Sequence, residues 1–264
     1  MKVLRFLYQG QLHAGSLTTE GVVPFATADL LGLIQSGSLP AASGAAIPLA
    51  EVTPVLPYDV PPKIWCIGLN YHSHALDINA VQPEEPGSFM KPASCMFPPE
   101  GEIVLPPPAV SNDVDAEGEL AVVIGKKVKG LVSLDEALDA IFGYTTTLDL
   151  TALDVLAKNP RYLTRAKSMD TFFSFGPVIV TKDEIEEVND LEVITEHNGS
   201  VWSRDFVRNM KHRPLELVRF HSQAMTLYPG DIISTGCPKG ARIKSGDTVR
   251  ARIVGVGTLG ATVR

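Results

Sequence analysis

The sequence predicts an α+β, β-rich fold: an open or rolled β-sheet with a few peripheral helices, preceded by a small N-terminal domain. Short runs rich in β-branched and aromatic residues recur from residue 61 onward, separated by Gly, Pro and Asp. Few segments have helical periodicity, and those few do not alternate regularly with the strand-like runs. This pattern argues against a regular βαβ architecture.

Residues 1–58 are expected to form the small N-terminal α/β domain. Alternating positions such as Val3, Arg5 and Leu7 suggest a strand near the start. A helix is expected around Thr27–Gln35, followed by a Gly/Ala/Pro-rich linker over residues 37–49. Residues 59–264 then form the larger domain.

The larger domain contains most of the predicted secondary structure. Two helices stand out: one opens at Ser133 with Glu136 completing a capping box, and the other starts near Pro214. The predicted strands are the runs KIWCIGL, EIVLP, ELAVVIG, GYTTTLDL, PVIV, LEVITEHNG, DIIST and TVRARIVGVG.

A glycine pattern near the C-terminus resembles a dinucleotide-binding fingerprint. Residues 255–260 read GVGTLG, which matches GxGxxG. That fingerprint requires its glycines to open a helix whose N-terminus receives the pyrophosphate. Only four residues follow Gly260, so a turn in a terminal β segment is the better interpretation.

Composition and charge exclude several partners. The chain has 23 basic and 30 acidic residues and no basic run, which argues against nucleic-acid binding. Pro, Gly or charge interrupts every apolar stretch before it could span a bilayer, so no membrane partner is expected. Cys66, Cys95 and Cys237 show no CxxC spacing, and we expect a reducing, cytoplasmic location.

An acidic cluster lies at the entrance to an apolar strand. Glu117 and Glu119 are two residues apart, so both project from the same face of that strand. Two adjacent carboxylates repel each other and need solvent, a cation or a shared proton. An exposed acidic strand edge would satisfy the same pattern.

Asp149 adds a third carboxylate, in a β-branched run that should be buried. If the fold brings it to Glu117 and Glu119, the three form an all-oxygen set. Hard oxygen ligands favour Mg²⁺, with Mn²⁺ or Ca²⁺ as further options, over zinc. Such a set also leaves coordination positions open for substrate and water.

The order of these motifs resembles that of the fumarylacetoacetate hydrolase superfamily. The resemblance covers roughly residues 60 to 264, and eight motifs occur in the same order. They are GLNYHSHA at 68–75, FMKP at 89–92, EGELAVVIG at 117–125, GYTTTLD at 143–149, RAKSMD at 165–170, NG at 198–199, PGD with TGCPKG at 229–240, and GD with GTLG at 246–260.

The resemblance implies a fold, a site and an assembly. The fold would be a mixed rolled sheet, and the protein would be a homodimer. Glu117, Glu119 and Asp149 would be the metal ligands. His74 with Asp77 would form a catalytic dyad, because positions three apart on a helix are neighbours. Taken alone, His74 would be read as a surface histidine.

Further site residues follow from the same comparison of motifs. Lys167 falls on the active-site lysine of the superfamily, although taken alone it would be read as a solvated lysine. Tyr71, Lys91, Leu153, Leu156 and Cys237 fall on positions expected to bind substrate.

The chain also departs from the superfamily pattern. Leu153 and Leu156 stand where an Arg and a Gln are usual, Cys237 replaces a Thr, and Asp77 replaces a Glu. Arg and Gln are suited to binding a carboxylate or keto oxygen. Their loss predicts a less acidic, more apolar distal substrate group, or a different reaction. Cys237 is expected in the pocket wall rather than as a nucleophile.

The expected function is metal-dependent hydrolysis of a C–C bond in a small 2,4-dioxo acid, such as an acylpyruvate. The metal would polarise the 2-oxo group, His74 with Asp77 would deprotonate water, and Lys167 would stabilise developing negative charge. An isomerase, tautomerase or decarboxylase of a 2-oxo acid could use the same site. A catalytically degenerate, ligand-binding member is the alternative outside catalysis.

Overall fold

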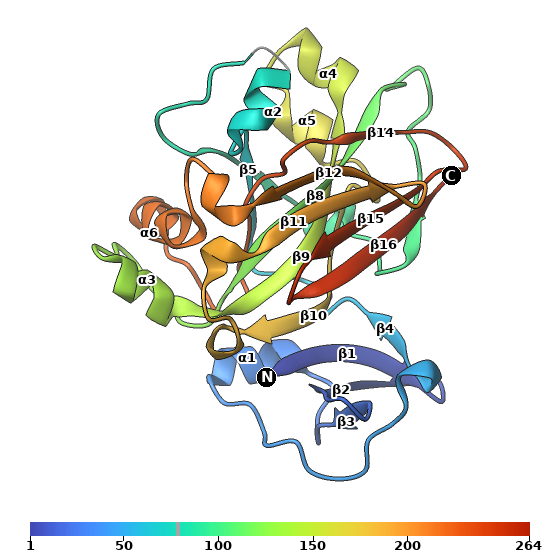
Figure 1. Ribbon diagram of the computed structural model, residues 1–264, viewed down its shortest axis with the longest axis vertical. Helices are drawn as coiled ribbons and strands as arrows, with labels where there is room; N and C mark the ends of the chain where they lie inside the picture. The colour runs from blue at the N-terminus through green and yellow to red at the C-terminus, as the bar shows by residue number, and fades with distance from the viewer. Residues whose placement is uncertain (78–79) are drawn as a thin grey trace.

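The computed structural model describes residues 1–77 and 80–264, and for Asp77 it describes only the backbone. The chain forms two mixed β-sheets with short helices at their edges (Figure 1), which confirms the predicted α+β, β-rich fold. Parallel pairing of β13 with β5 and of β16 with β7 makes both sheets mixed.

The larger sheet has eleven strands, of which nine follow one another across it. In that order they are β3 (Val22–Pro24), β2 (Gln11–Leu17), β1 (Lys2–Tyr8), β10 (Phe173–Thr181), β9 (Ile141–Ala152), β8 (Val114–Ile124), β13 (Ile232–Ser234), β5 (Ile64–Gly68) and β6 (Gly87–Lys91). The other two pair with strands of this path: β14 (Ala241–Ile243) with β8 and β4 (Thr53–Val55) with β1.

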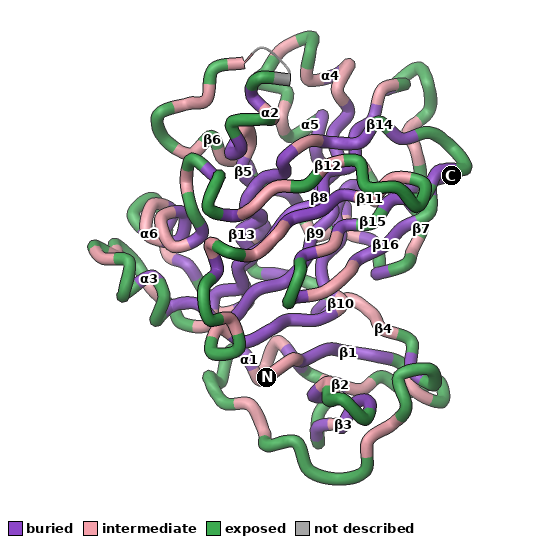
Figure 2. Tube along the Cα trace, in the orientation of Figure 1, coloured by how far each residue is buried: buried purple, intermediate pink, exposed green. Residues whose placement is uncertain are grey.

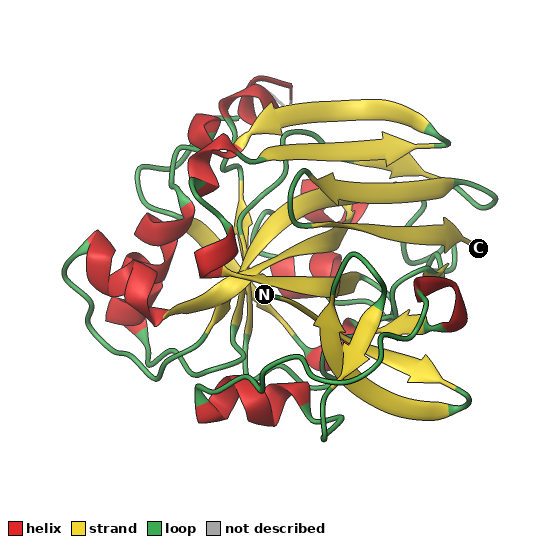
Figure 3. Ribbon diagram, turned by 60° about the horizontal axis from the view of Figure 1, so that its bottom comes forward, coloured by secondary structure: helices red, strands yellow, loops and turns green. Residues whose placement is uncertain are grey.

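The smaller sheet packs against the larger one and has five strands. They are β12 (Ser200–Phe206), β11 (Glu192–His197), β15 (Thr248–Ile253), β16 (Gly257–Val263) and β7 (Gly101–Ile103). Figure 3 shows the strands of the two sheets as separate sets with the helices around them.

The helices are short and lie at the periphery. The α-helices are α1 (Leu30–Ser36), α2 (His72–Asp77), α3 (Leu134–Ala140), α4 (Leu153–Lys158), α5 (Leu163–Lys167) and α6 (Pro214–Ala224). The 3₁₀ turns are η1 (Leu49–Glu51), η2 (Ala93–Cys95), η3 (Lys182–Glu184), η4 (Val188–Asp190) and η5 (Val207–Asn209). No helix in the described part of the chain is long and apolar enough to cross a membrane.

Local sequence signals account for several helix boundaries. Ser133 and Glu136 form the predicted capping box, with the Glu136 amide donating to Ser133 Oγ at 3.1 Å. Helix α6 begins at Pro214, as predicted. Helix α1 begins three residues later than expected, because the Asp29 side chain accepts from the Gly32 amide and caps it there.

The N-terminal segment is an extension of the larger sheet. Strand β1 pairs antiparallel with β10, with Lys2 opposite Val180, so sheet pairing runs unbroken across residue 58. Figure 1 shows this segment in blue below β10. A domain boundary at residue 58 stays a prediction.

The glycine pattern at residues 255–260 is the predicted turn within a terminal β segment. Gly255 has a φ of +88° in the turn that joins β15 to β16. Strand β16 then pairs antiparallel with β15. The pattern therefore opens a strand rather than a helix, and the dinucleotide interpretation is excluded.

Strands β8 and β9 form the buried centre of the molecule, coloured purple in Figure 2. They pair antiparallel with Glu117 opposite Asp149 and Gly118 opposite Leu148. Because side chains alternate across a strand, odd-numbered residues of both strands share one face and even-numbered residues the other. The even face packs on the smaller sheet, whereas the odd face carries the carboxylates.

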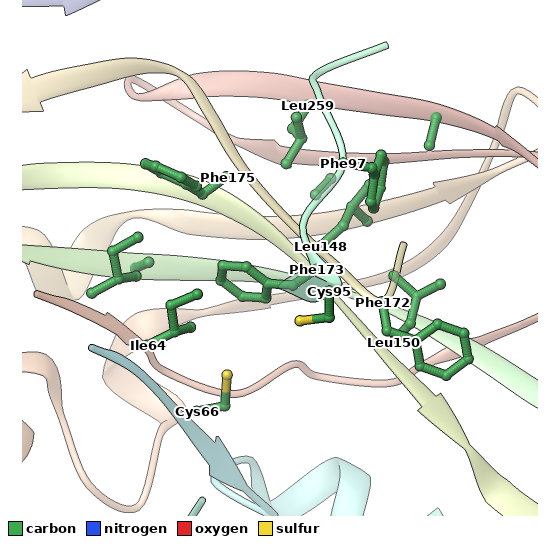
Figure 4. Packing of buried hydrophobic residues seen from close by; sticks show 14 of the residues in the cluster. Ile64, Cys66, Cys95, Phe97, Leu148, Leu150, Phe172, Phe173, Phe175 and Leu259 are labelled. Carbon is green, nitrogen blue, oxygen red and sulfur yellow. The ribbon is translucent and has the colours of Figure 1, made fainter. Parts of the chain in front are cut away.

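The apolar core on the even face fixes how closely the sheets approach. Leu148 and Leu150 on this face belong to the cluster in Figure 4, together with Leu259 of β16. Phe173 and Phe175 of the same cluster lie on the odd face, because they are the cross-strand partners of Asp149 and Thr147. Gly118 lies in the tightest part of this contact. A Cβ atom on Gly118 would lie 2.7 Å from Thr195 Oγ1 and 3.0 Å from Ala251 Cβ. The glycine between the two glutamates therefore permits the sheets to pack.

Replacing Gly118 by Ala should lower the free energy of unfolding by about 1–3 kcal/mol, because the added methyl group overpacks the sheet interface. Gly257→Ala is the matched control, since a Cβ there meets nothing closer than 3.8 Å. Urea unfolding of both variants measures the difference. Equal stabilities for the two variants would show that the approach of the sheets does not depend on Gly118.

Candidate active site

A cavity of about 770 Å³ opens on the odd face of β8, between α2, α4, α5 and the loop after β13. Six residues assigned to the site from the sequence line it: His74, Glu117, Leu153, Leu156, Lys167 and Cys237. These side chains come from segments far apart in the chain, and the pairing of the central strands brings them together.

The three predicted carboxylates meet beside this cavity. Glu117 on β8 stands directly opposite Asp149 on β9. Lys167 Nζ donates to Glu117 Oε2 and to Asp149 Oδ2, at 2.9 Å in each case. These two carboxylate oxygens are therefore no further apart than twice that distance. Glu119 lies two residues along β8, on the same face.

Hydroxyl and amide groups orient Glu119. Its Oε2 atom accepts from Ser234 Oγ at 2.5 Å and from the Gly236 amide at 2.9 Å. Ser234 is in turn 2.6 Å from Thr147 Oγ1. Among the described residues, the buried Glu119 Oε1 atom has no hydrogen-bond partner. A buried acceptor without a partner is costly, so this oxygen is available to a ligand.

The donor set fits a divalent cation. Oxygens of Glu117 and Glu119 and the sulfur of Cys237 lie within 4.8 Å of one another, whereas Asp149, paired with Lys91 and Lys167, is not part of this group. No hydrogen-bond donor of the described chain contacts Glu119 Oε1, so a cation could bind there without displacing one. Glu117 and Asp149, in contrast, already form ion pairs with Lys167. Carboxylate oxygens suit a hard cation such as Mg²⁺ or Mn²⁺.

The local electrostatics also show an excess of buried negative charge. Burial raises the pKa of Glu119 to about 8, and the charges of Asp149 and Glu117 add to this effect. For Glu117, burial is outweighed by the nearby charges of Lys167 and His74, so its pKa lies below the usual value. The pKa values of the two glutamates thus differ because Lys167 forms an ion pair with Glu117, whereas for Glu119 burial and the two neighbouring carboxylates outweigh the charge of Lys167.

The Cys237 thiol is held in its neutral form. Burial raises its pKa well above the usual value, and the charges of Glu117 and Glu119 raise it further. A thiolate is the nucleophilic form of cysteine. Cys237 lines the cavity, and its environment does not favour nucleophilic attack.

Lys91 lies outside the cavity lining and contacts a carboxylate instead. Its ammonium group is fully buried, forms an ion pair with Asp149 and donates to the Phe172 carbonyl at 2.6 Å. Asp149 is thus held between Lys91 and Lys167. The sequence placed Lys91 against the substrate, but in this geometry it holds Asp149 in position.

Tyr71 and Asp77 occupy the ends of the His74 segment. Tyr71 is fully buried, pairs with Met210 in an isolated bridge and is not part of the cavity lining. Helix α2 ends at Asp77, whose side chain lies outside the described residues. The predicted pairing of Asp77 with His74 stays a prediction.

Hydrogen bonds of the Asn70 side chain position the start of the helix that carries His74. Asn70 Nδ2 donates to the Thr235 carbonyl at 2.7 Å and to the His212 carbonyl at 2.8 Å, and Asn70 Oδ1 accepts from the His212 amide at 2.9 Å. A buried side-chain amide with all three bonds made fixes its segment firmly. The start of α2 is thereby tied to the loop that carries Cys237.

Several lining residues were not predicted. Asp115 faces the cavity two residues before Glu117, and the period of two along a strand could have identified it. Thr151 donates to Glu117 Oε1. Trp202 comes from β12 and Arg242 from β14, and no motif had included them; Lys239 lies within the TGCPKG motif, but no role had been assigned to it.

Comparison with known proteins extends these observations. Residues 63–264 match the family model described as fumarylacetoacetate (FAA) hydrolase, C-terminal. The mitochondrial oxaloacetate tautomerase FAHD2A of Bos taurus is 37% identical over 222 residues, which are 81% of this chain and 70% of the relative.

Two solved structures cover the whole chain. The 5-carboxymethyl-2-hydroxymuconate delta-isomerase of Mycobacterium smegmatis is 34% identical with a TM-score of 0.82, and 98% of its chain is covered. The maleylpyruvate hydrolase of Sphingobium sp. SYK-6, in complex with manganese(II) and pyruvate, is 28% identical with a TM-score of 0.81, and 98% of its chain is covered. The relatives thus include a hydrolase, an isomerase and a tautomerase.

Replacing Lys167 by Met should destabilise the protein by about 3–5 kcal/mol, because Glu117 and Asp149 would each lose a buried cationic partner. Lys126→Met is the matched control: its ion pair with Asp139 is exposed, and its loss should change stability little. Urea unfolding without divalent cations measures both variants. A Lys167→Met protein as stable as Lys126→Met would contradict the assigned charge balance.

Proposed function

The chain belongs to the fumarylacetoacetate hydrolase family, and we propose that it is a divalent-metal-dependent hydrolase that cleaves a C–C bond in a small 2,4-dioxo acid. The observation that supports the proposal is that His74, Lys167 and Glu117 line one cavity, with Asp149 opposite Glu117 on the neighbouring strand and Glu119 two residues along β8. A general base, a cation and a metal-ligand set together meet the requirements of this chemistry.

The three carboxylates would hold Mg²⁺ or Mn²⁺, and the metal would supply Lewis-acid polarisation of the substrate's carboxylate and 2-oxo oxygens. The manganese(II) and pyruvate bound to the related maleylpyruvate hydrolase support both the ion and a pyruvate-like head group. Ser234 and the Gly236 amide orient Glu119 before any ligand arrives.

The residues of the chain would then carry out the proton and charge movements. His74 accepts a proton from water, and the resulting hydroxide adds to the distal carbonyl carbon. The bond between that carbon and the adjacent methylene breaks, and its electron pair leaves with the pyruvate fragment, which takes up a proton. One water is consumed, and a carboxylate and pyruvate are formed. Lys167 places positive charge where negative charge develops.

Isomerisation or tautomerisation of a 2-oxo acid is the second candidate. The tautomerase and isomerase relatives, at 37% and 34% identity, are more similar to this chain than the maleylpyruvate hydrolase at 28%. These reactions need the same polarised oxo group and a base such as His74, but no delivery of water. Whether hydrolysis or isomerisation takes place therefore depends on whether His74 lies next to a water molecule or next to a C–H bond of the substrate.

Removal of divalent metal should abolish activity toward acylpyruvates. EDTA is expected to reduce turnover at least 100-fold, and excess Mg²⁺ or Mn²⁺ should restore it, because the polarising charge is lost and regained. Glu119→Gln should show the same loss without rescue, whereas Glu20→Gln, in the exposed N-terminal segment, should behave like the unaltered protein. Undiminished turnover in EDTA would refute the metal-dependent proposal.

His74→Gln should lower kcat by about 10²–10⁴-fold and leave metal binding intact, since a general base contributes on that scale. Product analysis by NMR separates the reactions. Two fragments indicate hydrolysis, released CO₂ indicates decarboxylation, and an unchanged formula indicates isomerisation or tautomerisation. A rise in Tm with Mg²⁺ and oxalate, but no product from any substrate, would indicate a ligand-binding protein instead.

A further inference from the structure

One side of the cavity is apolar over two helices. Leu153 and Leu156 on α4 and Leu163 on α5 are half-buried and line the cavity, with Pro160 between the two helices. We call these three leucines the leucine wall. The backbone amide of Leu153 donates to the Asp113 carbonyl at 2.8 Å, which ties the start of α4 to the chain before β8.

The cations of the cavity are already engaged or exposed. Lys167 is the one buried cation among the described lining residues, and it is bonded to Glu117 and Asp149. The Arg242 side chain is 71% exposed and forms an ion pair with Asp113 at 3.2 Å. An exposed, paired guanidinium attracts a second anion only weakly, because solvent and salt screen it.

Lys239 also has a partner within the lining. Its ammonium group lies 5.9 Å from the centre of the Trp202 ring, and Trp202 Nε1 donates to the Gly240 carbonyl at 2.8 Å. The indole is therefore fixed in place and adds further apolar surface to the cavity.

The balance of these contacts disfavours a second carboxylate on the substrate. A carboxylate placed against the leucine wall would lose hydration without gaining a buried cation, which is unfavourable. An alkyl or aryl group placed there would instead remove apolar surface from water, at about 0.8 kcal/mol per methylene. The cavity of about 770 Å³ is far larger than a pyruvate-sized head group needs, since one water occupies roughly 30 Å³.

We propose that the natural substrate is a monocarboxylic 2-oxo acid whose distal group is alkyl or aryl and lies against the leucine wall. This inference rests on the proposed function for the head group, which it places at the carboxylates. It sets the chain apart from relatives named for oxaloacetate and maleylpyruvate, both of which carry two carboxylates. Leu153, Leu156 and Leu163 would be the residues that determine specificity.

Binding of unreactive oxo acids tests the inference independently of turnover. With saturating Mn²⁺, the Kd of straight-chain 2-oxo monocarboxylates from 2-oxobutyrate to 2-oxooctanoate, measured by calorimetry, should fall about fourfold per methylene. Phenylpyruvate should bind as tightly as the longer members. 2-Oxoglutarate should bind at least tenfold more weakly than 2-oxohexanoate. Equal or tighter binding of 2-oxoglutarate would overturn the inference.

Variants of the wall provide the second test. Leu153→Arg should weaken binding of 2-oxooctanoate about tenfold and improve binding of 2-oxoglutarate. Leu138→Arg makes the same change on α3, outside the cavity lining, and should alter neither Kd. An unchanged preference in a folded Leu153→Arg protein would overturn the role of the wall.

The two proposals fail in different ways. If the Kd falls with the length of the distal alkyl group but no C–C bond is cleaved, the hydrolase proposal is overturned and the inference is supported. If a C–C bond is cleaved but dicarboxylates are preferred, the hydrolase proposal is supported and the inference is overturned. If no 2-oxo acid binds in the presence of Mn²⁺, both are overturned.

Discussion

The site depends on the compensation of three buried carboxylates by two lysines. Asp149 is held between Lys91 and Lys167, and Lys167 also reaches Glu117. Three buried negative charges would otherwise be strongly unfavourable, because both desolvation and mutual repulsion oppose them. Glu119 has no ion pair with either lysine, and its pKa is raised to about 8 by burial and by the charges of Asp149 and Glu117, so that it favours its protonated form at neutral pH. It keeps one buried oxygen without a partner in the described structure. A cation bound at Glu119 would take the place of that proton.

That arrangement requires two sheets in close contact. Water must be excluded from the even face of β8 and β9, so that the smaller sheet packs against it and fixes the position of the two strands. The charged side chains on the odd face then keep fixed positions relative to one another. Gly118 permits this by presenting no side chain to Thr195 and Ala251. The same short segment thus serves packing through Gly118 and chemistry through Glu117 and Glu119, with the alternation of the strand separating the two roles.

Sequence patterns predicted the β-rich fold and many of its strands, because strand runs show in local composition and periodicity, but β6, β12 and β14 were not among the predicted runs. The period of two placed Glu117 and Glu119 together, and motif order brought in Asp149, His74 and Lys167. The role of Lys91 could not be predicted, since its partner Asp149 lies 58 residues away and only sheet pairing joins them. The short helices α4 and α5 were also missed: each is five or six residues long and has too few turns to show a period.

The charged and the apolar lining of the cavity lie on different elements of the fold. The carboxylates sit on the central strands β8 and β9, where a change of one residue would disturb packing in the middle of the sheet, whereas Lys167 lies at the end of α5 and Lys91 at the end of β6. The leucine wall sits on two short peripheral helices, where side chains can change without altering β8 or β9. Evolution of substrate choice is therefore easiest at positions such as Leu153 and Leu156, and evolution of the head-group chemistry is hardest at Glu117 and Asp149. The leucine wall beside the carboxylates and Lys167 is the combination that we expect for a substrate with one carboxylate, at its 2-oxo end, and an apolar group at its distal end.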